Sequence, residues 1–151
     1  IMVALLVTLV VLTERVGIGA RGLDRAERWW VGYPFQLYLA WISVALIANT
    51  FHFASATGWG GFGVPETVWS PLMMAVATGL AGAMAFHRRA WIFPLVVAWA
   101  LVGIRARHPE VTSVAATAAA LAVVCLVLSV ASLLRARRSA GAEEREQSAA
   151  A

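Results

Sequence analysis

The sequence predicts an all-α membrane protein, a bundle of five transmembrane helices, and three observations support this fold class. The chain is 61% hydrophobic and 13% charged, whereas soluble domains average about 25% charged residues. Its apolar residues gather in five runs that approach or reach the length of a membrane-spanning helix. Its basic residues lie almost entirely between those runs, where topology signals are placed. A soluble domain of 151 residues could not bury this much apolar surface.

The five apolar runs define the predicted helices in order. A spanning helix needs about 20 mostly apolar residues. Residues 34–53 and 111–134 reach that length, residues 68–86 come close, and residues 90–104 are shorter. Residues 1–13 cover only part of it and no Met precedes them, so we expect this first helix to be the truncated end of a longer one.

All twelve basic residues are Arg, and their placement predicts the orientation of the bundle. With five spans, Arg105 and Arg107 lie on one side of the membrane, and all other arginines lie on the opposite side. The positive-inside rule places that Arg-rich side in the cytoplasm. The predicted transmembrane domain covers residues 1–138, and the small, polar and charged residues 139–151 are expected to form a disordered cytoplasmic tail. The net charge of +4 is therefore a topology signal, and nucleic acid is not an expected partner.

Two tryptophans stand apart from those near the predicted membrane interfaces. At 1.5 Å per residue, Trp41 and Trp99 lie at about the same depth, roughly 10–12 Å from the cytoplasmic ends of their helices. Two indoles at one depth on two helices either pack together or form the wall of a site for a flat apolar ligand. Both interpretations stay open at this point.

A polar stripe is predicted on the same helix as Trp41. Tyr38, Asn49 and His52 share a face with Trp41 and Ala45, at offsets of three, four and seven residues. Polar side chains on a spanning helix usually face the bundle interior or a cavity, because lipid offers them no partner. Asn49 either makes an interhelical hydrogen bond of about 1 kcal/mol or less, or contacts a ligand in a pocket that opens to the outer side.

Small residues at four-residue spacing mark the third predicted helix. Ala75, Gly79 and Ala83, with Gly82 beside them, would let two helix backbones approach closely in lipid. We interpret this face as a helix-packing surface, for a helix of the same chain or of a partner.

The sequence contains no pattern typical of a catalytic or metal site. No pair of His or Cys has metal-ligand spacing, and no carboxylate lies within a predicted span. A phosphate-binding loop and a nucleophile elbow are also absent from the sequence. We therefore expect no enzymatic activity and no bound metal.

Part of the sequence resembles a known family. The stretch PFQLYLAWISVALIANT, residues 34–50, resembles the P-F-x-x-Y-x-x-W-I-x-x-A-x-I-A-N pattern of the longer bacterial tryptophan-rich sensory proteins. These proteins are TspO/MBR-related members of the translocator protein group. GWGGFG at residues 58–63 looks like their glycine loop, Trp69 like their helix-starting Trp, and VVAWALVGIRAR at residues 96–107 like their V-V-x-W-A-L-x-G-I segment. The resemblance runs over about half of the chain.

The resemblance implies a location in the bacterial inner membrane and a candidate ligand. Translocator proteins are five-helix proteins that bind porphyrins and other flat hydrophobic molecules in an aromatic pocket. Trp41, Asn49 and Trp99 match letters of the family pattern. The family's proline-rich segment, with its W-x-F and V-W motifs, does not occur in this sequence and would lie upstream of Ile1. This departure puts the transfer of tetrapyrrole binding in doubt.

Two functions fit these observations. The first is a membrane sensor or carrier for a flat hydrophobic small molecule, with a tetrapyrrole, a carotenoid or a lipid as candidates. Trp41, Trp99 and Tyr38 would contact that ligand, and Asn49 and His52 would orient its polar edge. The second is a non-catalytic accessory subunit of a larger membrane complex or a homo-oligomer, which would use the small face of the third helix. Membrane lipids are expected partners of the protein in both functions.

Overall fold

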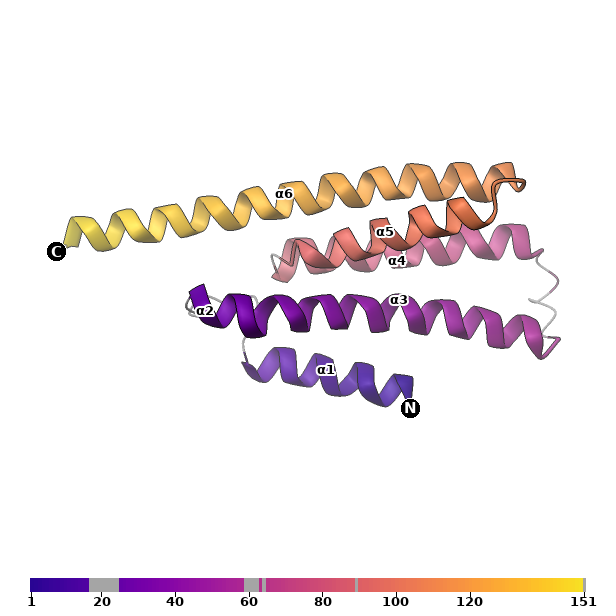
Figure 1. Ribbon diagram of the computed structural model, residues 1–151, viewed down its shortest axis with the longest axis horizontal. Coiled ribbons are helices and arrows are strands. Elements are labelled where there is room, and N and C mark those ends of the chain that lie inside the picture. The colour runs from indigo at the N-terminus through magenta and orange to yellow at the C-terminus, as the bar shows by residue number, and fades with distance from the viewer. Residues whose placement is uncertain (17–24, 59–62, 64, 89, 151) are drawn as a thin grey trace.

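The computed structural model describes residues 1–16, 25–58, 63, 65–88 and 90–150, and its regular structure in these ranges is helical, with no strand. Five long helices account for most of the chain (Figure 1): α1 (Met2–Val16), α3 (Tyr33–Ala56), α4 (Glu66–Arg88), α5 (Ile92–Arg107) and α6 (Thr112–Ala150). A short helix, α2 (Arg25–Glu27), and a π-helical turn, η1 (Arg28–Gly32), lead into α3. Each long helix covers most or all of one predicted apolar run. The predicted fold class, an all-α membrane bundle, is confirmed.

Three helices contain segments long and apolar enough to cross a membrane by length and composition. These segments are Trp29–Ala54, Val68–Arg88 and Thr112–Arg138. The other two long helices, α1 and α5, have only 15 and 16 residues. Only 22 to 33% of the residues in the most apolar window of each segment are buried, as expected where lipid rather than water surrounds the bundle.

The core of the bundle is centred on α5, which packs against α3, α4 and α6. Phe93, Val97 and Leu101 of α5 are almost completely buried, as is Cys125 of α6. Seven of the 16 residues of α5 are buried, so neighbouring helices cover much of its surface. In contrast, α1 packs mainly against α3 at the edge of the bundle (Figure 1).

Serine hydroxyl groups near the middle of α6 hold this helix to its neighbours. Ser129 Oγ donates to the carbonyl oxygen of Trp91 at 2.8 Å, and Ser132 Oγ donates to that of Ala85 at 3.3 Å. In lipid, such interhelical bonds and close packing hold helices together, because no water is excluded when the helices associate.

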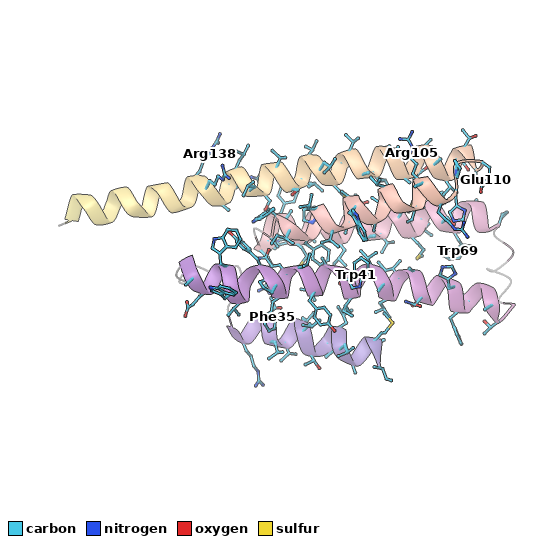
Figure 2. The ribbon with its side chains drawn as sticks, viewed as in Figure 1. Phe35, Trp41, Trp69, Arg105, Glu110 and Arg138 are labelled. Carbon is cyan, nitrogen blue, oxygen red and sulfur yellow. The ribbon has the colours of Figure 1, made fainter. Side chains whose placement is uncertain are left out.

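Helices α3 to α6 alternate in direction, as the predicted topology requires. The C-terminal ends of α3 and α5 and the N-terminal ends of α4 and α6 lie at one end of the bundle (Figure 1). The opposite end carries Arg135, whose guanidinium lies 4.9 Å from the ring centroid of Phe86. Arg138 follows beyond it on α6 (Figure 2).

In the structure α6 continues as a helix to Ala150 and extends beyond the other helices (Figure 1). The disorder expected for residues 139–151 stays a prediction. The segment is rich in Ala and Glu, which favour helix, and extending an existing helix avoids the cost of nucleation.

Candidate functional site

The structure brings Trp41 and Trp99 into contact. Trp41 lies about a third of the way along α3, on the side that faces α5 in Figure 2, and Trp99 lies on α5. Their ring centroids are 5.4 Å apart and their planes are inclined by 41°. This separation lies within the range at which aromatic rings attract each other. The pair is therefore a packed contact between two helices.

The same two rings also line an open groove on the side of the bundle. The groove has a volume of about 780 Å³, and residues of α3, α5 and α6 form its walls: Leu37, Tyr38, Trp41, Leu95, Val96, Ala98, Trp99, Val102 and Leu126. None of these side chains carries a charge. Trp41 is 46% exposed and Trp99 is 64% exposed, so the rings contact each other while parts of both remain accessible. In a bilayer, such a groove opens sideways to the lipid chains.

Asn49 and His52 do not belong to this groove. Asn49 Nδ2 donates to the carbonyl oxygen of Ala45 at 2.8 Å, within its own helix, and the side chain is exposed. His52 lines a different cavity. The residues of the predicted polar stripe do share one face of α3, but they extend over a long part of the helix. At 1.5 Å per residue, about 16 Å of helix axis separates Trp41 from His52.

The second cavity lies between four helices at the end of the bundle opposite to Arg138. Its volume is about 440 Å³, and its lining residues come from α3 (Val44, Ile47, Ala48, His52), α4 (Ser70, Met73, Met74, Ala77), α5 (Val97, Ala100, Leu101, Ile104), and the turn into α6 with its first residues (His108, Val111, Val114). At its mouth, His108 Nδ1 lies 3.8 Å from Glu110 Oε1. Figure 2 places Glu110 at this end of the bundle.

The small residues predicted for helix packing face two directions. Ala75, Gly79 and Ala83 are exposed on the outer side of α4. A Cβ added at Gly79 would meet nothing within 4 Å, whereas one at Gly82 would lie 3.8 Å from Leu128 Cδ1 of α6. Within the chain, α4 instead packs through a neighbouring stripe of mostly small buried residues: Met74, Ala77, Thr78, Ala81 and Ala85.

Several lining residues were not predicted from the sequence. The aliphatic groove residues Leu37, Leu95, Val102 and Leu126 carry no signal that separates them from lipid-facing residues. The sequence contains more information on the second cavity, because the predicted topology already places both His52 and His108 at the outer end of the bundle.

Other expectations fall outside these two sites. Within the described ranges, no group of three or more His, Cys, Asp or Glu could hold a metal ion. The glycine loop that resembles the family, with Trp59 and Phe62, lies mostly outside the described residues. Only Gly58 and Gly63 are described, both with the positive φ angles that glycine adopts readily.

A multi-pass membrane protein with an aromatic groove on the side of its helical bundle is the class that the fold and the site define. The chain belongs to the TSPO-like protein family, whose model matches residues 1–131. This match confirms the resemblance seen in the sequence. Searches of curated proteins and of solved structures gave no match.

Proposed function

We propose that this protein binds a flat hydrophobic molecule in the groove lined by Trp41 and Trp99, as a non-enzymatic sensor or carrier. The ligand classes that suit the groove are tetrapyrroles, carotenoids and lipids. We place the protein in the bacterial inner membrane with its C-terminus in the cytoplasm, because most of its arginines lie on that side. The observation that carries the proposal is the contact of two half-exposed indoles in a wide, uncharged groove.

The groove has the properties that such a ligand requires. Its volume lies within the range of about 300–1,000 Å³ typical of small-molecule sites, and its walls are apolar with few polar groups. The indole faces offer stacking worth about 0.5–1.5 kcal/mol for each aromatic contact. Tyr38 supplies a hydroxyl group that could bond a polar edge of the ligand.

The proposal is tested by titrating protoporphyrin IX into the protein in lipid nanodiscs and following the porphyrin absorbance. Trp41→Leu and Trp99→Leu should each weaken binding by about tenfold, because each removes one stacking face. Trp30→Leu is the control, since Trp30 is 82% exposed and does not line the groove. Equal affinity in all four proteins would contradict a role for the pair in porphyrin binding. A parallel titration with a carotenoid then tests whether that ligand class depends on the same rings.

A second candidate function, an accessory subunit of a membrane complex or a homo-oligomer, is favoured by the outer face of α4. Ala75, Gly79 and Ala83 leave this face flat and exposed, which suits close approach of another helix. Gly79→Leu tests it cleanly, because the added side chain points into open space within the protein. Gly82→Leu is less clean, since it would also press on Leu128.

The readout is the oligomeric or complex mass after gentle extraction, with Gly103→Leu as the matched control on α5, where a Cβ also meets nothing within 4 Å. Loss of assembly in Gly79→Leu alone supports the subunit function. Unchanged assembly in both variants would contradict a role of this face of α4 in binding a partner helix.

A further inference from the structure

We propose that the second cavity, the one lined by His52 and His108, binds a single-chain lipid with a carboxylate headgroup, such as a long-chain fatty acid. This site is separate from the tryptophan groove and does not depend on the function proposed for it. The carboxylate would lie between the two imidazoles at the mouth, and the alkyl chain would run inward between α3, α4 and α5.

The lining of the cavity is divided between a polar mouth and an apolar interior. His52, Ser70 and His108 are the lining residues with polar side chains, and the interior consists of aliphatic side chains and two methionines. Imidazole and hydroxyl groups donate hydrogen bonds to a carboxylate, and a protonated imidazole adds charge assistance. No carboxylate of the protein is among the lining residues; Glu110 pairs with His108 instead and is 67% exposed.

The interior suits a flexible chain better than a flat ring system. No Phe, Tyr or Trp is among the lining residues, so a planar ligand finds no large aromatic ring in the interior on which to stack. Met73 and Met74 are unbranched and polarizable, and such side chains adapt to irregular apolar ligands. The volume of about 440 Å³ is within the usual range for small-molecule sites.

The shape and position of the cavity also match a lipid chain. Its lining on α5 runs from Val97 to Ile104 and on to His108, which corresponds to about 16 Å along the helix axis. His52 and His108 lie near the C-terminal ends of α3 and α5, which meet at one end of the bundle (Figure 1), where we expect the lipid headgroups. A bound fatty acid would therefore have the same orientation as a lipid of that leaflet.

The experiment uses palmitic acid with a photoreactive diazirine in its chain, added to the protein in nanodiscs, with labelled residues located by mass spectrometry. We expect labelling at Met73, Met74 and Leu101, and labelling about tenfold weaker with the corresponding methyl ester, which cannot ionise. On the unaltered protein, oleate should compete and oleyl alcohol should not. Equal competition by oleyl alcohol would overturn recognition of the carboxylate.

Variants then locate the site. The double variant His52→Ala with His108→Ala should lose about tenfold or more of the labelling, and Ala100→Phe should block it by filling the cavity. Ala106→Phe is the matched control, because Ala106 is exposed on α5 and does not line the cavity. Labelling that persists in the histidine and Ala100 variants, or that spreads over lipid-facing residues, contradicts the proposal. Trp41→Leu should leave the labelling unchanged, which separates this site from the tryptophan groove.

Discussion

The two sites of this bundle use opposite faces of one short helix. The groove takes Leu95, Trp99 and Val102 of α5, and the cavity takes Val97, Leu101 and Ile104. Each set repeats at three or four residues, so each forms one stripe of a helix, and the two stripes lie on opposite sides. The groove is aromatic and open, whereas the cavity is aliphatic with imidazoles at its mouth. A helix buried on most sides can thus separate two environments of different chemistry.

The largest expected effect comes from truncating the helix that both sites share. Phe93 of α5 is only 1% exposed, and Phe93→Ala should lower the free energy of unfolding by about 3 kcal/mol, since the space it leaves has no side chain to fill it. Porphyrin binding and fatty-acid labelling should then fall together. Unfolding in detergent followed by circular dichroism measures the loss. Phe53→Ala is the control, because Phe53 is 71% exposed on α3. An equal loss of unfolding free energy in this variant would show that the stability of the bundle does not depend on the burial of Phe93.

A smaller effect should separate the two sites. Val102 lines the groove and lies one turn after Trp99, so Val102→Trp should fill part of the groove and weaken porphyrin binding by about tenfold. Fatty-acid labelling should not change. Val76→Trp adds the same ring to an exposed position on α4 that lines neither site. If both substitutions weaken both porphyrin binding and fatty-acid labelling, the two sites are not independent.

The smallest effect is expected from the hydroxyl group that holds α6 to the start of α5. Ser129→Ala removes the bond to the Trp91 carbonyl oxygen and should cost about 0.6 kcal/mol of stability, the average for interhelical hydrogen bonds in membranes. Along α6, Leu126 of the groove lies three residues from Ser129, whereas Val114 of the cavity lies fifteen residues away, so porphyrin affinity should change more than fatty-acid labelling. Thr50→Ala, whose hydroxyl group bonds within its own helix to Leu46, should change neither stability nor binding.

The positions of the helices could be predicted from the sequence because the length of an apolar run has a direct physical meaning in a bilayer. Even the short run at residues 90–104 became a helix, α5. The C-terminal segment was harder to predict, since its composition suits both a disordered tail and the continuation of α6. Polarity alone does not distinguish the two when a helix already precedes the segment.

The site could be predicted only in part. Depth along the helices placed Trp41 and Trp99 at one level, and the structure brings them into contact. The periodicity of α3 put His52 on the same face as Trp41 but gave no information on how far a cavity extends along that face. The residues of α5 are apolar around most of the helix circumference. The sequence therefore could not show which of them line the groove, which line the cavity and which belong to the packed core.

The most direct test of the account is native mass spectrometry of the protein extracted gently from its own membrane, comparing the unaltered chain with Trp41→Leu. If the groove binds a ligand, the 16.1 kDa chain should carry the added mass of a small hydrophobic molecule, lost on collisional activation and absent in the variant. Release of the chain from an assembly of other polypeptides, without such a molecule, would contradict the account and leave the two tryptophans as a packing contact.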